Sequence, residues 1–477
     1  MNEISPILVW LRRDFRLHDN PMLRAAQDSG RPIIPVFILD EIVETYGSAP
    51  KWRLKEAVKS FQNTLESLGS KLVVRKGQSL DVINDLLTET GATSVYWARA
   101  YDPKSIARDK KIKLALKQKT IDAKSFKGFL VFEPWLAKTK AGTFFKVYSP
   151  MWRALQEIHV EPEADEVNEL KLPEHWPDSV PLDDLKLSDG MGRGAEIVKH
   201  HANIGEKKAL ERLYQFVGAK IDQYKLKRDF LDENYTSGLS ENLTWGEVSA
   251  RRMWFLAGNS KKLGDRGAEH FQKEIAWREF AYHLSYHTPE IEDQNWRDNW
   301  NNFPWRGDCD DAKKWRQGRT GEPLIDAAMR ELYITGKMHN RARMLVASYL
   351  TKHLMIDWRV GKAWFEETLI DWDPASNAMG WQWVAGCGPD AAPYFRIFNP
   401  KGQAEKFDAK EIYQNYYLNN GCEGSESALS YYQAIPKSWN LSCEDSYPEP
   451  MIDLKIGRER ALKAYKTLQS DNYQKFS

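Results

Sequence analysis

The chain has 477 residues, of which 42% are hydrophobic and 28% are charged, and its formal net charge is +1. This length predicts two or three domains, and the composition excludes an intrinsically disordered chain. The near-neutral charge excludes a basic field over the whole surface, so a polyanion would have to bind at a local patch.

The first 130 residues alternate between short hydrophobic runs and amphipathic stretches. Five runs are typical of buried strands: 7–12, 32–39, 71–76, 94–99 and 122–128. Helices are predicted between them, notably at 51–68 and 79–90; the second places four apolar residues on one face, Leu80, Ile83, Leu86 and Leu87. The alternation predicts a Rossmann-like α/β domain with a five-stranded parallel sheet. No G-x-G-x-x-G follows the first strand, so a purely structural domain remains an equal alternative.

Residues 133–205 have a different composition. Between 157 and 199 there are twelve Asp or Glu against four Lys or Arg, together with four prolines: Pro162, Pro173, Pro177 and Pro181. Such a stretch is typical of a long, solvated, acidic connector. We expect it to join an α/β domain at 1–132 to a second domain at 206–477.

The second domain has helical periodicity to the end of the chain and almost no strand signal, so it should be all-α. Twelve of the nineteen tryptophans lie between Trp245 and Trp383. An indole can stack on a flat ring, at about 1–3 kcal/mol per contact, and it is readily oxidised by one electron. A large, flat redox cofactor would use both properties, although packing alone could explain many of these residues.

The termini and the cysteines bear on the cellular compartment. Residues 1–16 lack the features of a signal peptide, and no run of about 18 apolar residues could cross a membrane. The four cysteines show no C-x-x-C spacing, which indicates reduced thiols rather than a disulfide framework or a metal site: Cys309, Cys387, Cys422 and Cys443. We expect a cytoplasmic protein without a metal.

Five blocks of sequence, spread over nearly the whole chain, resemble the photolyase/cryptochrome family. They are LVWLRRDFRLHDNPML (8–23), TSGLSENLTWGEVSARRMW (236–254), EIAWREFAYHL (274–284), GRTGEPLIDAAMRELYITGKMHNRARMLVASYL (318–350) and LIDWDPASNAMGWQWVAGCGPDAAPYFRIFNPKGQAEKFD (369–408). LTWGEVS and FLVFEPW favour the class III cyclobutane pyrimidine dimer (CPD) photolyases, which are relatives of plant cryptochromes. The resemblance implies a deoxyribodipyrimidine photo-lyase with an all-α FAD-binding domain.

The resemblance implies that a Thr-Ser turn holds the FAD phosphates, which suits an anion because hydroxyls and free N–H groups converge there. Taken alone, the turn is typical of a simple helix cap, and Gly238 replaces an arginine found in some relatives. Arg343 and Asp371 match an ion pair beside the flavin ring, and Asp373 borders the ribityl chain. The implied cofactor-binding set is Tyr224, Thr236, Ser237, Gly238, Leu239, Ser240, Phe271, Asn340, Arg343, Asp371, Asp373 and Asn377.

Asn377 aligns with the residue that faces flavin N5. Its carbonyl can accept a hydrogen bond from N5–H, and its amide has no acidic proton to give. This favours the fully reduced, anionic FADH⁻ that repair requires. Plant cryptochromes carry an aspartic acid at this position, so the asparagine favours repair over signalling.

The resemblance also assigns roles to the tryptophans and to the lesion pocket. Trp381, Trp358 and Trp305 match a tryptophan triad that conducts electrons from the flavin to the surface. Trp277 and Trp383 match two rings that enclose a flipped dimer, and Glu274 matches the acid that hydrogen-bonds its bases. The remaining implied lesion or DNA contacts are Arg228, Arg278, Asn340, Arg341, Met344 and Gln403. Enzymes for the (6-4) lesion carry histidines at positions 340 and 344, so a CPD is favoured.

Two departures from the family pattern stand out. Lys337 replaces a tryptophan that is usual in repair enzymes of this branch; it could contact a phosphate, but it removes a wall of the pocket. Residues 97–109 lack the Asn-Glu pair that holds folate in bacterial class I enzymes, where Lys104 and Ser105 stand instead. An antenna chromophore is expected, with methenyltetrahydrofolate the first candidate by branch, but no site is assigned.

The sequence therefore predicts light-driven repair of DNA, in which excited FADH⁻ gives an electron to the flipped dimer and regains it after the ring splits. The protein should act as a monomer. The alternative is a cryptochrome-like blue-light photoreceptor that signals through a partner without repair. Lys337 favours it; Asn377, the retained lesion pocket and the expected lack of a signalling tail disfavour it. A non-catalytic nucleic-acid binder would leave the flavin residues unexplained.

Overall fold

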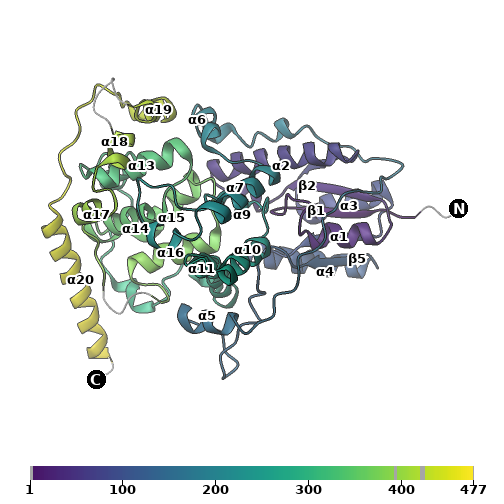
Figure 1. Cartoon of the computed structure of the whole chain (residues 1–477), viewed down its shortest axis with the longest axis horizontal. Helices are drawn as coiled ribbons and strands as arrows, with labels where there is room; N and C mark the ends of the chain where they lie inside the picture. Colours follow the sequence, from purple (N-terminus) through teal and green to yellow (C-terminus); the bar gives the residue numbers. More distant parts are fainter. Residues whose placement is uncertain (1–3, 391–394, 419–424, 476–477) are drawn as a thin grey trace. The chain divides into compact units, whose positions relative to one another are not determined.

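The computed structural model describes residues 4–390, 395–418 and 425–475 (Figure 1). Its contacts form two compact units. Unit 1 comprises Met1–Gly190, Asn203–Lys225 and Thr236–Pro289, and unit 2 comprises Met191–Ala202, Leu226–Tyr235 and Glu290–Ser477. The division predicted at residues 132 and 205 follows secondary-structure content and stays a prediction, since the contacts group the chain differently.

Unit 1 contains a five-stranded sheet, whose strands are drawn as arrows in Figure 1. The strands are β1 (Ile7–Leu11), β2 (Ile33–Leu39), β3 (Val73–Lys76), β4 (Ser94–Ala98) and β5 (Asp122–Phe126). They lie in the order β3-β2-β1-β4-β5, and every neighbouring pair is parallel. All residues of β1 and β2 are buried, as expected for a parallel sheet covered on both faces. The predicted α/β fold is confirmed, and each strand end lies within two residues of its predicted place.

Helices connect the strands and continue unit 1. Those between strands are α1 (Pro21–Asp28), α2 (Ser48–Ser67), α3 (Ser79–Thr90) and α4 (Pro103–Gln118), with the short η1 (Val43–Thr45). Those that follow are α5 (Tyr148–Leu155), α7 (Glu206–Ala219), α9 (Ser240–Thr244), α10 (Ala250–Leu263) and α11 (Ala268–His287). Buried residues of α7, α10 and α11, among them Phe216, Met253 and Phe271, form a second core in this unit.

The acidic segment 133–205 contains more structure than a solvated connector. It includes α5, two short turns, η2 (Leu182–Leu185) and η3 (Asp189–Met191), and α6 (Gly194–His201). Four of its apolar residues pack into the core around the sheet: Val167, Leu170, Leu185 and Leu187. The predicted solvation is wrong at these positions, because widely spaced apolar side chains among the acids still bury their surface.

Unit 2 is helical. Its helices are α12 (Asp310–Arg316), α13 (Pro323–Thr335), α14 (Asn340–Ser348), α15 (Trp358–Thr368), α16 (Pro374–Ala385), α17 (Pro400–Phe407), α18 (Ile412–Leu418), α19 (Glu426–Ala434) and α20 (Leu454–Lys475). Shorter turns are η5 (Asp298–Asn302), the π-helical η6 (Tyr349–His353) and η7 (Lys437–Trp439), while α8 (Tyr224–Lys227) and η4 (Pro289–Glu292) lie where the chain passes between units. No strand follows β5 in the described residues, which confirms the predicted all-α character.

The cysteines and the membrane prediction can be compared with the structure. Cys309 and Cys387 are free thiols, but Cys443 is disulfide-bonded, so the prediction of four reduced thiols is wrong at Cys443; Cys422 lies outside the described residues. Of the helices in the described ranges, none combines the length and the hydropathy needed to span a bilayer. Nor do these ranges contain three or more His, Cys, Asp or Glu grouped as metal ligands.

Candidate functional site

The acids that follow α15 are each fixed by a specific partner in unit 2. Asp371 Oδ2 accepts a hydrogen bond of 2.7 Å from Arg343 Nη2, and Arg343 Nε donates to the Met338 carbonyl at 2.8 Å. Asp373 is the N-cap of α16, where its Oδ1 accepts from the Ser376 amide at 2.9 Å. The implied Arg343–Asp371 ion pair is therefore present; its place beside a flavin stays a prediction.

The side chain of Asn377 is oriented by the neighbouring helix α15. Its Nδ2 donates to the Lys362 carbonyl at 3.0 Å, so Oδ1 points the other way. Oδ1 is buried and meets no hydrogen-bond donor in the part of the chain that the structure describes. A buried acceptor without a donor costs about 1–3 kcal/mol. The site therefore fits a bound group that offers an N–H, as a reduced flavin does.

The three tryptophans of the implied triad all lie in unit 2, in different local settings. Trp381 is 2% exposed and packs against Gly361, where an added Cβ would lie 2.0 Å from the Trp381 Cη2 atom. Trp358 begins α15, the helix that carries Gly361, and its Nε1 donates to Asn295 Oδ1 at 2.9 Å. Trp305 is partly exposed. Burial thus decreases from Trp381 and Trp358 to Trp305, as a path toward the surface requires.

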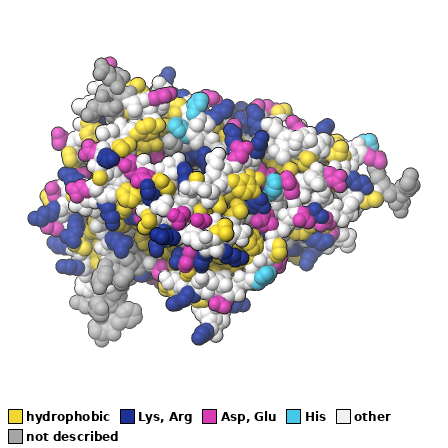
Figure 2. All heavy atoms as spheres, viewed as in Figure 1, with side chains coloured by type: hydrophobic (Ala, Val, Ile, Leu, Met, Phe, Trp, Pro, Cys, Tyr) yellow, Lys and Arg dark blue, Asp and Glu magenta, His cyan; other side chains and the backbone are white. Residues whose placement is uncertain are grey.

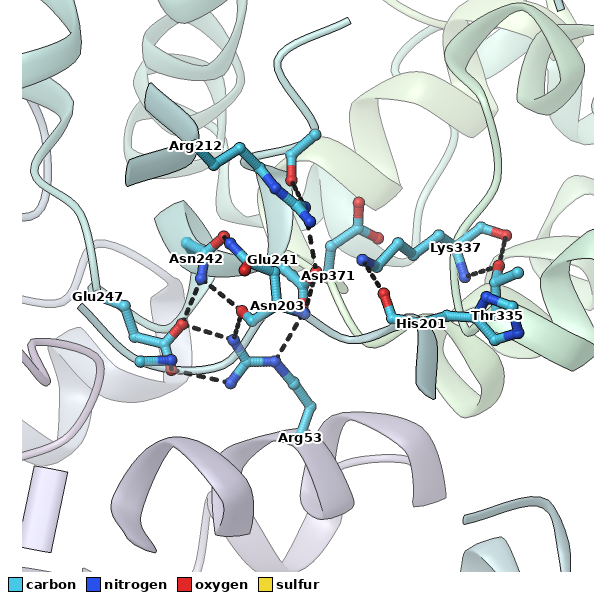
Figure 3. Close-up of polar contacts among 12 residues, drawn as sticks. Arg53, His201, Asn203, Arg212, Glu241, Asn242, Glu247, Thr335, Lys337 and Asp371 are labelled. Carbon is cyan, nitrogen blue, oxygen red and sulfur yellow. Dashed lines mark hydrogen bonds and ion pairs between the residues drawn. The ribbon is translucent and has the colours of Figure 1, made fainter. Parts of the chain in front are cut away.

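Position 337 is the main departure from the family pattern, and its contacts are in unit 2. Lys337 Nζ donates to the carbonyl of His201, the last residue of α6, at 2.7 Å (Figure 3). Its backbone N–H donates to Thr335 Oγ1 at 3.0 Å. The ammonium thus holds α6 in place. This contact explains the lysine at position 337 without a contact to a DNA phosphate.

Two of the predicted DNA-side residues of unit 2 lie beside Asp229. Asp229 Oδ2 accepts from Arg341 Nη2 at 2.6 Å, and its Oδ1 lies 3.9 Å from Arg228 Nε. Asn340 is exposed, with Nδ2 4.0 Å from Met344 Sδ. Gln403 Oε1 is buried and finds no donor among the described residues. The structure thus brings Arg228 and Arg341 to one carboxylate, and it places Asn340 beside Met344.

His339 precedes Asn340 and caps α14. Its Nδ1 accepts from the Arg341 amide at 3.1 Å, as a side-chain N-cap does. Burial is the main cause that lowers the pKa of His339 to about 4. The imidazole is therefore neutral near pH 7, and its contacts are those of a hydrogen-bonded helix residue rather than of a proton donor.

Trp383 borders a cavity of unit 2, next to a buried lysine. The cavity lining includes Arg297, Trp300, Lys352, Trp383, Phe395 and Tyr465. Trp383 Nε1 donates to the Asp390 carbonyl at 3.2 Å, and Lys352 Nζ donates to the Ala385 carbonyl at 2.6 Å. Burial lowers the pKa of Lys352 well below its usual range. Trp383 thus has a partly open environment, in which a flat ring could stack.

The Thr-Ser turn implied to hold phosphates lies in unit 1, and charged side chains fix it (Figure 3). Arg212 Nη1 donates to the Gly238 carbonyl at 2.8 Å, and the φ of Gly238 is +62°, which suits glycine. The next helix, α9, begins at Ser240, and its Glu241 accepts from the buried Arg53 at 2.9 Å. The turn is therefore held from both sides.

Tyr224 and Phe271, also implied in cofactor binding, contact each other in unit 1. Their rings meet edge-on at 5.5 Å between centroids, and both pack against Phe216. Each is less than 7% exposed. These contacts place both residues in the second core of unit 1, with little surface left for a ligand.

Three implied lesion residues lie on α11 of unit 1. Glu274 is 3.6 Å from His270 Nε2, and Trp277, one turn later, is half-buried and stacks on Tyr148. Arg278 instead donates to the Phe129 carbonyl at 3.0 Å and covers the Phe129 ring. Glu274 and Trp277 therefore share a helix face, whereas the contacts of Arg278 are those of a packing residue; its substrate role stays a prediction.

The sequence did not reveal a cavity at the carboxyl ends of β1, β2 and β4 in unit 1. Ligands of parallel sheets bind where the strand order reverses, which here is between β1 and β4. Four arginines and two aspartates line this cavity: Arg12, Arg13, Arg99, Arg108, Asp40 and Asp102. The guanidiniums of Arg12 and Arg108 lie over the Trp10 ring at 4.6 and 4.7 Å. Arg12 and Arg13, which directly follow β1, were the feature of the sequence that could have indicated this cavity.

Two family models match this chain. The model described as DNA photolyase matches residues 7–171, and the FAD binding domain of DNA photolyase matches residues 271–467. A deoxyribodipyrimidine photo-lyase of Agrobacterium fabrum is 41% identical over 97% of this chain and 98% of its own length. Cryptochrome-1 of Arabidopsis thaliana is 31% identical over 96% of this chain and 70% of its own length. A bacterial class III photolyase structure from Agrobacterium tumefaciens has a TM-score of 0.90 at 40% identity, covering 98% of this chain and 99% of that one.

Proposed function

Because the chain belongs to the DNA photolyase family, we propose that it repairs cyclobutane pyrimidine dimers in DNA under blue or near-UV light. It is an enzyme, a deoxyribodipyrimidine photo-lyase, which is a carbon–carbon lyase. The observation that carries the choice of repair is the orientation of Asn377. One N–H of its Nδ2 is used by the Lys362 carbonyl, which turns the Oδ1 acceptor away from that helix, and an amide has no acidic proton to give to the cofactor.

The cofactor is FAD, for which the chain carries the family's binding domain. When bound, FAD in its reduced, anionic form supplies the light-driven electron that opens the cyclobutane ring and takes it back afterwards. Thr236, Ser237 and Ser240 would hold the phosphates, and Arg343 with Asp371 would lie beside the ring. Asn377 would accept a hydrogen bond from N5–H. The protein thus binds and orients the cofactor, and it excludes water from the site.

The lesion residues would act on a dimer extruded from the duplex, whose stacking is already damaged. Trp277 and Trp383 would stack on it, and Glu274 would hydrogen-bond its bases. Arg228, Arg341 and Gln403 would contact the DNA. A CPD suits these residues better than a (6-4) lesion, because Asn340 and Met344 carry no imidazole and His339 has a pKa of about 4. The enzyme would act as a monomer in the cytoplasm.

A second, light-harvesting chromophore would bind in the cavity at the carboxyl ends of β1, β2 and β4. Its arginines suit a planar group, such as methenyltetrahydrofolate, because guanidinium faces stack on flat rings. Three of them already pair with carboxylates of the protein: Arg12 with Asp109, Arg108 with Asp40 and Arg99 with Glu133. Absorption near the folate maximum, retained when the protein is purified with this compound, would support its identity.

The alternative is a cryptochrome-like photoreceptor without repair, and Lys337 is the observation that favours it. Its ammonium binds the His201 carbonyl, where repair enzymes of this branch usually carry an indole. The two functions differ in one measurement. Reduced protein is mixed with an oligonucleotide that contains one thymine dimer, and the return of thymine absorbance is followed under blue light. If the protein repairs the dimer, the thymine absorbance should rise under blue light and stop rising in the dark. An unchanged absorbance at saturating protein would favour the photoreceptor function.

Trp277→Ala is expected to weaken binding to dimer-containing DNA by about tenfold or more, since base–aromatic stacking is worth about 1–3 kcal/mol per base. The variant should lose little affinity for undamaged DNA, which presents no flipped base. The two dissociation constants are measured by fluorescence anisotropy at fixed ionic strength. An equal loss on both DNAs would contradict stacking on the lesion.

A further inference from the structure

One face of the Trp277 indole is covered by the phenol ring of Tyr148, which begins α5. The ring centroids are 3.8 Å apart, and the ring planes differ by 6°. The Tyr148 hydroxyl donates to the Lys273 carbonyl at 2.8 Å, one helical turn before Trp277 on α11. The phenol is therefore held through both its ring and its hydroxyl.

The burial of the neighbours shows on which side of the indole Tyr148 lies. Tyr148 is 7% exposed, and it packs edge-on against Phe280, which is fully buried. Phe280 also meets Trp277, at 5.8 Å between ring centroids. Trp277 itself is only half-buried. Because Tyr148 and Phe280 occupy the inner side, solvent reaches the indole from the face opposite Tyr148.

This arrangement differs from what two free aromatic rings adopt. Free pairs favour offset or edge-to-face contacts over a parallel sandwich. Here the hydrogen bond to Lys273 and the edge of Phe280 impose the parallel geometry. The indole has therefore lost its rotational freedom before any ligand arrives, and a ligand that stacks on it need not order it.

We propose that Tyr148 is a positioning residue for the lesion, and that it presents the outer face of Trp277 as a fixed platform for an extruded pyrimidine. This rests on the proposed stacking role of Trp277. Glu274 lies one turn from Trp277 on the same helix face, so the platform and the acid keep a constant spacing. The ligand class is an extruded pyrimidine ring of the dimer, which completes a stack of three rings.

The test compares two substitutions of Tyr148 in the complete, reduced protein. Tyr148→Leu removes the ring, and it is expected to raise the dissociation constant for dimer-containing DNA about tenfold, which corresponds to about 1.4 kcal/mol. Tyr148→Phe keeps the stack and loses only the hydroxyl, so its affinity should lie between wild type and Tyr148→Leu. For both variants, binding to undamaged DNA and the repair yield per bound lesion at saturation should be unchanged.

Two controls separate positioning from loss of structure. Tyr96→Leu removes an equally buried tyrosine of unit 1 from β4, and it should leave lesion affinity unchanged. Equal losses for Tyr96→Leu and Tyr148→Leu, or an unchanged affinity for Tyr148→Leu, would overturn the proposal. Trp277→Ala is measured alongside. If Trp277→Ala weakens binding to damaged and undamaged DNA equally, the stacking role of Trp277 is overturned as well. If Trp277→Ala loses affinity for dimer-containing DNA and Tyr148→Leu does not, only the role of Tyr148 is overturned.

Discussion

Trp381→Phe is expected to slow the photoreduction of oxidised flavin by at least about tenfold, which corresponds to about 1.4 kcal/mol of added barrier. The reason is electronic, since a phenyl ring is much harder to oxidise by one electron than an indole. The proposed triad begins at Trp381, so its first step would lose its donor. Repair by enzyme that has been reduced chemically beforehand does not use the triad and should be spared.

The surroundings of Trp381 make phenylalanine the right replacement. The indole packs edge-on against Phe365 at 4.9 Å and against Trp315 at 6.1 Å between ring centroids. A phenyl ring keeps these aromatic contacts and fits against Gly361, although the smaller ring leaves some empty space, which costs stability.

Trp315→Phe is the matched control for this measurement. Trp315 is fully buried and touches Trp381, but its Nε1 is used by the Val346 carbonyl at 3.1 Å, as in a core residue. Both variants are illuminated with an external reductant, and the loss of oxidised-flavin absorbance is timed. Slow photoreduction in Trp381→Phe alone supports conduction. A collapse of repair by the pre-reduced Trp381→Phe enzyme would mean that the residue is structural.

Arg53→Met is expected to destabilise unit 1 by about 3–5 kcal/mol, because it strands two buried carboxylates. Arg53 is fully buried on α2, and it donates to Glu241 Oε2 at 2.9 Å, to Glu247 Oε2 at 2.5 Å and to the Asn203 carbonyl at 3.0 Å (Figure 3). Burial acts to lower the pKa of Arg53, but Glu247 and Glu241 outweigh it and raise the pKa. The guanidinium is therefore charged at every pH at which the protein folds.

The measurement is the thermal midpoint, which should fall by on the order of 10 °C for a loss of this size. Flavin retention should fall with it, because Glu241 lies in the first turn of α9, the helix after the Thr-Ser turn. Arg24→Met is the control: Arg24 pairs with Asp28 at 2.9 Å on the surface of α1, and such pairs contribute under about 1 kcal/mol. Adding Glu241→Gln and Glu247→Gln to Arg53→Met should recover most of the loss, since neutral amides replace the stranded charges. An Arg53→Met midpoint within a degree or two of wild type would contradict the assignment.

The sheet was predictable from local pattern, and the buried network around Arg53 was not. Hydrophobic runs marked β1 and β2, because strands buried on both faces show no alternation. Arg53 lies in a helix that was predicted, but its partners are 188 and 194 residues away in the chain. No local signal distinguishes such an arginine from an exposed one. The same limit hid Val167, whose burial depends on surface supplied by the distant sheet.

The candidate site was likewise predictable from the sequence only in part. The residue types at 343, 371 and 377 were identified by resemblance, and the Arg343–Asp371 pair formed as implied. What the sequence could not give was orientation. The direction of the Asn377 carbonyl depends on Lys362, the contacts of Arg278 depend on Phe129, and the stack on Trp277 depends on Tyr148. Each is a contact between separate elements.

The surface agrees with the near-neutral net charge. Figure 2 shows Lys and Arg side chains interspersed with Asp and Glu over most of the visible face. Long-range attraction of DNA would therefore be modest, and it should weaken further as salt increases. Recognition would depend on short-range contacts with the extruded base, which is where the aromatic residues of α11 would act.

The contact between Gly361 and Trp381 has a consequence for speed. The rate of electron tunnelling between two rings falls exponentially with the distance between their edges. Gly361 lets the backbone of α15 lie directly against the Trp381 indole on α16, and α15 also carries Trp358, so thermal motion has little room to move the helix that carries Trp358 away from Trp381. A hop that starts at Trp381 should therefore depend only weakly on temperature, even though the protein around it softens on warming.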